Sequence, residues 1–244
     1  MAEYKLSNPL TIEEKLQVTR LIGHDSMGIL DVIRSDILIA QGDNDVSQLK
    51  NTLYVVQHIG MLNMAITSLT LHNKYTLDDL RTDNYFDAFK LQNDFDGLNA
   101  LFKEEMTFLK DISHKEFLSD RSLVHCVLYN LSKNAFKRGG AKKVEISVKE
   151  HSTLQDIVYS AEGSLDYKDF IGFHVHDNGK GFPAEKNFGE NFTKAPKIGE
   201  HGFGLYFVGL AAKVLRGQVG IKSEPGDTTV SFYHPIYVDL KQNK

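Results

Sequence analysis

The chain has 244 residues, of which 41% are hydrophobic and 25% charged, with a formal net charge of -4. This length suggests one or two domains at about 150 residues per domain, and the composition is that of an ordinary globular protein. Without a basic surplus it gives no indication of nucleic-acid or membrane-surface binding. No apolar run reaches the roughly 18 residues of a membrane-spanning helix, and the first ten residues lack a signal peptide's apolar core, so we expect a cytoplasmic protein.

The N-terminal third of the sequence predicts two long amphipathic helices. In residues 11–40 the apolar residues recur at spacings of three, four and seven, which places them on one helical stripe. The stretch "TIEE" opens this helix as a capping box, with a threonine cap and a glutamate three positions on. The Gly and Asx residues of "QGDND" end it, and residues 46–72 form the second helix.

Two such helices joined by a short turn form an antiparallel hairpin, which buries only one side of each helix. We therefore expect two hairpins to form a four-helix bundle in a homodimer. Residues 73–84 are polar and rich in turn residues, and we place the domain boundary there. Residues 1–78 form the hairpin domain and residues 79–244 a second domain.

The second domain alternates helical and strand patterns. Residues 118–140 read as a helix that a glycine pair ends, and residues 204–217 as an apolar helix. Cys126, the only cysteine, lies among apolar neighbours in the first of these helices and is predicted to be a buried structural thiol. Strand patterns occupy residues 142–150, 170–177 and 228–234. The fold class is α+β: a helical hairpin forming a dimeric bundle, followed by an α/β sandwich with helices on one face of a mixed sheet.

Three short motifs of the second domain could carry chemistry. In "NLSKNA", Asn130 and Asn134 are four positions apart and share one helix face. In "HDNGKGF", Asp177 ends an apolar strand, and Gly179 and Gly181 allow the backbone to approach a flat ligand closely. The stretch "GEHGFGL" is a glycine-rich turn that runs into a helix, where free N–H groups favour phosphate.

Each motif also has a simpler explanation. The asparagines could be solvated, the glycine-rich turn could be only a turn, and Asn-Gly after a strand is by default a hairpin turn. A Walker A loop, G-x-x-x-x-G-K-[ST], is absent. The order and spacing of the three motifs together are more specific than any one of them.

In this order the motifs resemble those of the sensor histidine kinases, whose nucleotide-binding domain belongs to the wider GHKL ATPase group. "VLYNLSKNAFK" resembles the N box, "HVHDNGKGF" the first glycine box and "GEHGFGLYFVGLAAKVLRGQVGI" the second, while "EPGDTTVSFYHP" is similar to the closing glycine-threonine strand. "NFTKAPK" is similar to the Phe-Thr-Thr-Lys lid of part of the family, and "GHDSMGIL" falls where the family keeps its phosphoacceptor box. The resemblance spans about residues 11–235.

The resemblance implies roles for individual residues around ATP. Asp177 would accept a hydrogen bond from the adenine amino group, and Thr228 would support the same edge. The nucleotide-binding positions also include Gly179 and Gly181 of the first glycine box.

On the phosphate side, the resemblance implies that Asn134 ligates Mg²⁺ and that Asn130 helps to place the metal and the phosphates. Lys137 would approach the phosphates, while Gly202 and Gly204 would let the lid close over them. GHKL hydrolases carry a water-activating glutamate at the position of Asn130, so this domain is expected to transfer phosphate to a side chain.

His24 is the expected phosphoacceptor. If Ile22 is the centre of the buried stripe, His24 lies about 200° around the helix, facing away from the core. A neutral imidazole is nucleophilic, and its ordinary pKa near 6.5 makes that form prevalent at cellular pH. Asp25 can accept the proton as the N–P bond forms. His58 and His72 are competing candidates that no acid follows, and a solvated surface histidine is the alternative for His24.

The sequence departs from the family pattern at three places. Ile29 stands where the commonest phosphoacceptor box has proline. Gly28 stands where kinases that also dephosphorylate their partner carry Thr or Asn, so weak or absent phosphatase activity is expected. Glu200 and His201 precede "GFGL", and His201 could touch the γ-phosphate or stabilise the lid.

Taken as a whole, the resemblance implies a two-component histidine kinase. It would use ATP and Mg²⁺ to phosphorylate His24, then pass the phosphate to an aspartate of a response-regulator receiver domain. The chain begins about ten residues before the hairpin, so its input is expected from a separate sensor protein, unless the chain is a fragment. The alternatives are a phosphotransfer protein with a non-catalytic GHKL-like domain, a GHKL serine kinase, and a nonenzymatic dimeric scaffold.

Overall fold

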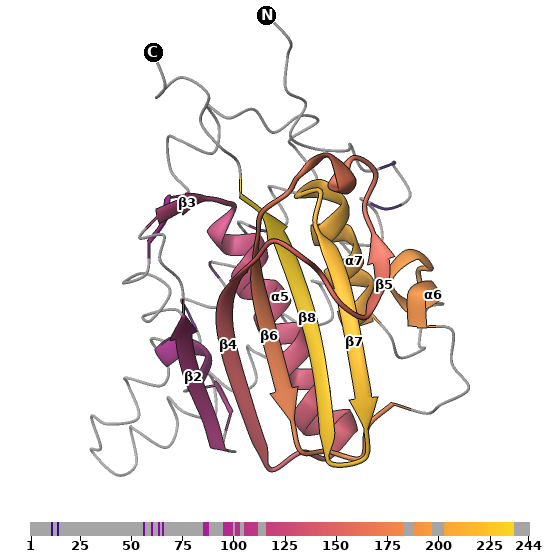
Figure 1. Ribbon diagram of the computed structural model, residues 1–244. Coiled ribbons are helices and arrows are strands. Elements are labelled where there is room, and N and C mark those ends of the chain that lie inside the picture. Colours follow the sequence, from indigo (N-terminus) through magenta and orange to yellow (C-terminus); the bar gives the residue numbers. More distant parts are fainter. Residues whose placement is uncertain are drawn as a thin grey trace, which may run out of the picture.

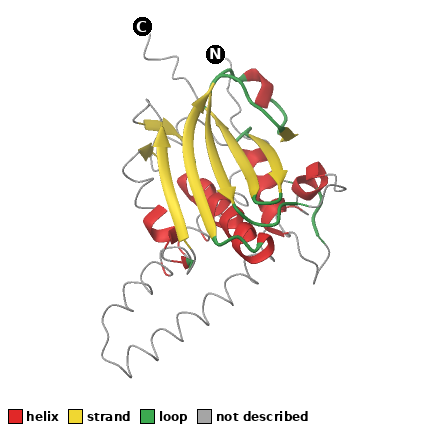
Figure 2. Cartoon of the chain, turned by 60° about the horizontal axis from the view of Figure 1, so that its bottom comes forward, coloured by secondary structure: helices red, strands yellow, loops and turns green. Residues whose placement is uncertain are grey.

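A six-stranded mixed sheet with helices against one face forms the body of the described structure (Figures 1 and 2). The computed structural model describes residues 11, 14, 56, 60, 63, 65, 85–87, 95–99, 101–102, 105–111, 116–182, 188–196 and 203–236. The sheet order is β2-β4-β6-β8-β7-β5, and within it β2 runs parallel to β4 while every other pair is antiparallel. The strands are β2 (Glu105–Asp111), β4 (Lys143–His151), β5 (Ile157–Ser160), β6 (Phe170–Asp177), β7 (Gln218–Glu224) and β8 (Asp227–Pro235). Two short strands, β1 (Tyr85–Asp87) and β3 (Glu116–Leu118), pair separately.

The helices begin and end at residues that satisfy their terminal backbone groups. Helix α5 (Arg121–Asn134) is capped by Asp120, whose Oδ1 accepts from the N–H groups of Ser122 and Leu123 at 2.9 and 3.1 Å. A π turn (Ala135–Gly139) follows it and ends at Gly140, which has φ of 66°. Helices α6 (Phe188–Thr193) and α7 (Phe203–Val214) complete the layer, and a 3-10 turn (Ser164–Asp166) joins β5 to β6.

Side-chain alternation along the central strands separates the two faces of the sheet. On β4 the apolar residues Val144, Ile146 and Val148 are fully buried, whereas the residues between them are only partly covered. Phe173 on β6 and Phe232 on β8 are buried on the same face, which packs against α5 and α7 (Figure 1). The opposite face carries the polar residues of these strands.

This architecture confirms the predicted α/β sandwich. The predicted strands 142–150, 170–177 and 228–234 correspond to β4, β6 and β8. The predicted helix 118–140 contains α5, and the predicted helix 204–217 overlaps α7, which begins one residue earlier. Cys126 is buried, as predicted, and forms no disulfide. The segments β2, β5 and β7 are strands that the sequence analysis did not identify.

The predicted hairpin lies mostly outside the described residues, and the dimer and the boundary near residue 78 stay predictions. The capping box is present: Thr11 N–H donates to Glu14 Oε2 at 2.7 Å and Glu14 N–H donates to Thr11 Oγ1 at 3.2 Å. In the second predicted helix, residues 56, 60, 63 and 65 are helical.

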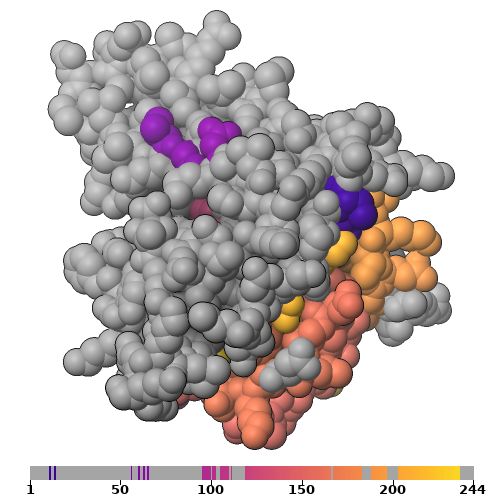
Figure 3. All heavy atoms as spheres, turned by 90° about the horizontal axis from the view of Figure 1, so that it is seen from above, coloured from indigo at the N-terminus to yellow at the C-terminus, as the bar shows by residue number. Residues whose placement is uncertain are grey.

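Glu14 connects the start of the first predicted helix to α7. Lys213 Nζ donates to both carboxylate oxygens of Glu14, at 2.8 and 2.9 Å. Burial alone would raise the pKa of Glu14, but the hydrogen bonds from Lys213 and Thr11 hold it below its usual value. In Figure 3 the indigo N-terminal patch lies beside the orange and yellow atoms of the C-terminal half. Beside this ion pair is a cavity of about 220 Å³, whose lining includes Tyr159 and Tyr206.

None of the helices in the described part of the chain combines the length and the apolar character that a bilayer-spanning segment requires.

Candidate functional site

The candidate residues of the second domain meet on the helix-covered face at one end of the central strands. Asp177 is the last residue of β6, and it pairs with Val144 at the start of β4 and with Thr228 near the start of β8. Asn134 is the last residue of α5, which packs against this sheet. One helix and three strands thus contribute to one region.

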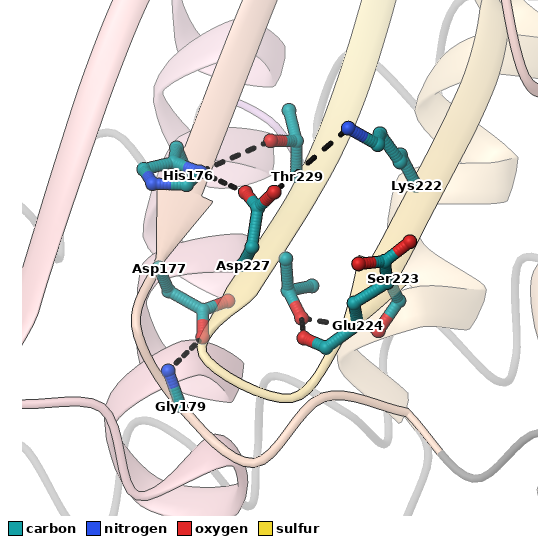
Figure 4. A network of polar contacts seen from close by, with 9 residues as sticks. His176, Asp177, Gly179, Lys222, Ser223, Glu224, Asp227 and Thr229 are labelled. Atoms are coloured by element: carbon teal, nitrogen blue, oxygen red, sulfur yellow. Dashed lines mark hydrogen bonds and ion pairs between the residues drawn. The ribbon is translucent and has the colours of Figure 1, made fainter.

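Asp177 is a buried carboxylate that holds the turn after it. Its Oδ1 accepts a hydrogen bond from Gly179 N–H at 2.8 Å (Figure 4), and only 6% of the residue is exposed. Burial raises the pKa of this carboxyl, although the Gly179 N–H and the nearby His176 act in the opposite direction. Oδ2 has no hydrogen-bond partner among the residues that the structure describes, so it is an acceptor available to a ligand.

Gly179 is required by the close approach of two backbone segments. A Cβ at this position would lie 2.7 Å from the carbonyl oxygen of Gly139 and 2.8 Å from Asp177 Oδ1. The same Gly139 oxygen accepts from Lys180 N–H at 2.9 Å, and the Gly179 oxygen accepts from Gly226 N–H at 2.7 Å. The glycine-rich turn is therefore fixed between the end of α5 and the β7–β8 turn.

Thr228 lies behind this turn and is almost completely buried, with 2% exposed. Its Oγ1 is 3.0 Å from Ser223 Oγ and donates to the carbonyl oxygen of Glu224 at 3.4 Å (Figure 4). Ser223 Oγ also accepts from Phe182 N–H at 2.8 Å, which ties the segment after Gly181 to β7. Gly181 itself has φ of 75°, a conformation that glycine adopts without strain.

The two asparagines of α5 face the first turn of α7. A Cβ on Gly204 would lie 3.0 Å from Asn130 Oδ1 and 3.3 Å from Asn134 Nδ2, so the glycine allows α7 to begin directly against both amides. Asn130 is buried and its Nδ2 donates to the carbonyl oxygen of Cys126 at 2.8 Å. Asn134 Nδ2 is buried without a hydrogen-bond partner in the described structure. A buried amide left without a partner is costly, unless a ligand completes its contacts.

The remaining predicted residues fall into two groups. Lys137 is exposed in the π turn one helical turn beyond Asn134. Gly202, His24 and Asp25 lie outside the described residues, as do the competing histidines His58 and His72 and the lid residue His201.

Three positioning residues were missed by the sequence analysis. Gly139 was read only as a helix end, although its carbonyl oxygen anchors Lys180. Asn178 was given no role of its own within "HDNGKGF", but its Oδ1 accepts from the N–H groups of Lys142 and Lys143 at 3.0 and 3.1 Å. Ser223 has no sequence signal, because Thr228 reaches it across the β7–β8 pair and Phe182 reaches it from the segment after β6.

The donor set suits a nucleotide and a hard cation. One buried carboxylate with a free oxygen can accept from a base amino group, and two amide side chains offer oxygen to a hard cation such as Mg²⁺. Among the described residues, no group of three or more His, Cys, Asp or Glu side chains could hold a metal ion by itself. Mg²⁺ bound here would therefore share its coordination with phosphate oxygens.

Comparison with known proteins gives a family match for part of the chain. Residues 119–238 match the family model described as "Histidine kinase-, DNA gyrase B-, and HSP90-like ATPase". No curated protein matches the chain.

Several solved structures resemble the chain at low identity. Histidine kinase AdeS of Acinetobacter baumannii is 17% identical with a TM-score of 0.45, over 88% of this chain and 98% of that one. The ATP-binding domain of PrrB from Mycobacterium tuberculosis is 17% identical with a TM-score of 0.44, over 63% and 97%. The histidine kinase domain of the blue-light activated kinase of Erythrobacter litoralis EL346 is 12% identical with a TM-score of 0.45, over 92% and 93%. These likenesses are too distant to carry functional information about this chain.

Proposed function

Since residues 119–238 belong to the histidine kinase-, DNA gyrase B-, and HSP90-like ATPase family, we propose that the chain is an ATP-dependent protein-histidine kinase. It phosphorylates its own His24 and passes the phosphate to an aspartate of a response-regulator receiver domain. The observation that carries this proposal is that the buried Asp177 lies beside Gly139, just after the end of α5, while the two amides of α5 face Gly204 in the first turn of α7.

Asp177 binds the adenine in this proposal. Its Oδ1 is held by Gly179 N–H, which leaves Oδ2 to accept from the exocyclic amino group of the base. Thr228 supports the same edge, and Gly179 and Gly181 bring the backbone close to the flat ring. The fixed position of the glycine-rich turn means that little ordering is needed when the nucleotide binds.

The phosphate side fits Mg²⁺. Asn134 offers Oδ1 to the metal, and the absence of a partner for its buried Nδ2 is explained if the triphosphate supplies an acceptor. Asn130 places the phosphates, and Lys137 reaches them from the exposed π turn. Gly202 and Gly204 allow the lid to close. Bound Mg²⁺ neutralises the charge that develops on the phosphate oxygens during transfer.

Asn130 favours transfer to a side chain over hydrolysis. An amide cannot take a proton from water, and the Nδ2 of Asn130 is already committed to the carbonyl oxygen of Cys126. The acceptor is a neutral His24 imidazole, whose ring nitrogen forms the N–P bond to the γ-phosphorus while the bond to ADP breaks. Asp25 accepts the proton that the ring loses.

The proposed partners follow from this reaction. The product phosphohistidine is consumed by an aspartate of a receiver domain. The kinase works in the cytoplasm as a homodimer formed by the helical hairpin.

The test is incubation of the purified chain with ATP labelled at the γ-phosphate and Mg²⁺. We expect acid-labile label on the wild-type chain and none on His24→Ala, while His58→Ala, a matched change in the second predicted helix, is labelled normally. Asn134→Ala should abolish labelling because the metal loses its ligand.

Other outcomes distinguish the alternatives. Acid-stable label that survives in His24→Ala would indicate a serine kinase. Normal ATP binding without labelling of any variant would indicate a phosphotransfer protein or a scaffold, and no ATP binding at all would contradict the nucleotide site itself.

A further inference from the structure

The sheet face opposite the helices carries a histidine pair that the proposed kinase reaction does not use. His151 ends β4, and His174 lies on β6 among the residues that point away from the helix layer. Both side chains are partly exposed. Their Nε2 atoms are 2.8 Å apart.

Gly172 makes this approach possible. It lies on β6 between the two rings, and a Cβ there would be 2.7 Å from the Nε2 atoms of both His151 and His174. Tyr233, the β8 residue paired with Gly172, contacts both rings edge to face, with centroids at 5.4 and 5.6 Å. The space left by the missing side chain of Gly172 and the ring of Tyr233 together hold the two imidazoles with their Nε2 atoms facing each other.

The other nitrogen of His174 is also held. Its Nδ1 is 2.8 Å from Ser231 Oγ, directly across the β6–β8 pair. Histidines that bind metals almost always have such a second contact, which fixes the tautomer and the ring orientation.

Burial favours the neutral form of both rings. Burial, with His151 and Lys149 nearby, lowers the pKa of His174 to about 4. Burial and Lys149 also lower the pKa of His151. Neutral imidazole is the form that binds metals.

We propose that His151 and His174 form a two-histidine binding site for a divalent transition-metal ion of the Zn²⁺, Ni²⁺ or Cu²⁺ class. Imidazole nitrogen is a preferred ligand of these ions, and two nitrogens at this separation can bind one ion side by side. When the ion binds, each neutral ring carries its single proton on Nδ1. The two Nε2 atoms then bind the ion in place of the N–H···N hydrogen bond between them, and no proton is released. Within the described part of the chain no third His, Cys, Asp or Glu joins the pair, so waters complete the coordination. Lys149 repels the cation, and the affinity is modest.

This site is separate from the proposed kinase reaction. Asp177 and Thr228 point into the helix-covered side of the sheet, whereas the histidine pair lies on the other side. Metal binding can therefore be measured without ATP, and its failure would leave the kinase proposal untouched.

The experiment is a calorimetric titration of the metal-free full chain with Zn²⁺, in excess Mg²⁺, which occupies oxygen sites and does not compete for imidazole. We expect saturable binding that is lost in His151→Ala and in His174→Ala. Ser231→Ala should weaken it roughly 10- to 100-fold, because the ring loses its orienting contact.

Gly172→Ala is the sharpest variant, because it removes no ligand. The added methyl displaces only the ends of two histidine side chains, so the chain should fold while Zn²⁺ binding is lost. His176→Ala is the matched control. His176 lies on the same strand and face and contacts Thr229 and Asp227 (Figure 4), and its loss should leave binding unchanged.

A second measurement uses Cu²⁺ as the probe. The electron paramagnetic resonance spectrum of the wild-type chain should show coupling to two imidazole nitrogens, and that of His174→Ala should lose it. Equal Zn²⁺ binding by the wild type, His151→Ala and His174→Ala would overturn the proposal, as would the absence of any binding.

Discussion

Replacing Asp177 by Asn is the most direct test of the proposed adenine contact. The asparagine Oδ1 can still accept from Gly179 N–H, so the turn should persist and the free energy of unfolding should change little. The other carboxylate oxygen, Oδ2, is replaced by an NH₂ group. This group is a hydrogen-bond donor, as is the amino group of the base, so the hydrogen bond between them is lost. A hydrogen bond to a charged group contributes about 1.5–3 kcal/mol, so we expect ATP to bind about 10- to 150-fold more weakly.

The assay is calorimetry or competition with a fluorescent nucleotide, together with a thermal melt of both proteins without ligand. GTP provides an internal control, because guanine has a carbonyl group where adenine has its amino group. Asp177→Asn should therefore lose less affinity for GTP than for ATP. ATP binding within twofold of the wild type at equal stability would refute the assignment of Asp177 to the base.

Three further predictions concern stability. Gly209→Ala should lower the free energy of unfolding by about 1–3 kcal/mol, because its Cβ would lie within 2 Å of the Phe192 carbonyl oxygen and force α6 away from α7. Urea denaturation measures this change, and unchanged stability would contradict that packing. Burial lowers the pKa of His234 to about 4. Between pH 6.5 and 4 the unfolded chain therefore binds a proton at this residue and the folded chain does not. As the pH falls through this range, the free energy of unfolding of the wild type should decrease by up to about 1.4 kcal/mol per pH unit because of this group. His234→Phe should flatten that slope, and an identical slope would show that the group does not titrate in this way. A double-mutant cycle with Glu14→Gln and Lys213→Met should give a coupling of about 0.5–1 kcal/mol, and additive effects would mean that the ion pair contributes nothing.

The elements with long, regular patterns were predictable from the sequence. Val144, Ile146 and Val148 alternate without interruption, and the π turn that follows α5 ends at a glycine pair. The missed strands lack such signals. β5 has only four residues, and Gly220 interrupts the alternation of β7 because the chain at Gln155 passes directly over it.

The candidate site was predictable as a set of motifs and not as an arrangement. The spacing of Asn130 and Asn134 places both on one helix face, which local geometry alone dictates. The pairing of Asp177 with Thr228 depends on sheet order, which is set by long-range contacts. Local preference also failed at Asn178, where the Asp177 carboxylate and the N–H groups of Lys142 and Lys143 outweigh the usual Asn-Gly hairpin.

The sheet order has a consequence for how the chain folds. β6 pairs with β4 on one side and with β8 on the other, while β5 and β7 close the far edge, so most strand contacts join residues distant in sequence. A high contact order of this kind slows folding, because loop entropy is lost before the contacts that compensate for it form. Asp177 and Thr228 come together only when β8 has paired with β6, and β8 lies near the C-terminal end of the chain. A truncated chain ending before Asp227 would therefore lack the base-binding edge altogether, and nucleotide binding to a nascent chain would report that the whole sheet has formed.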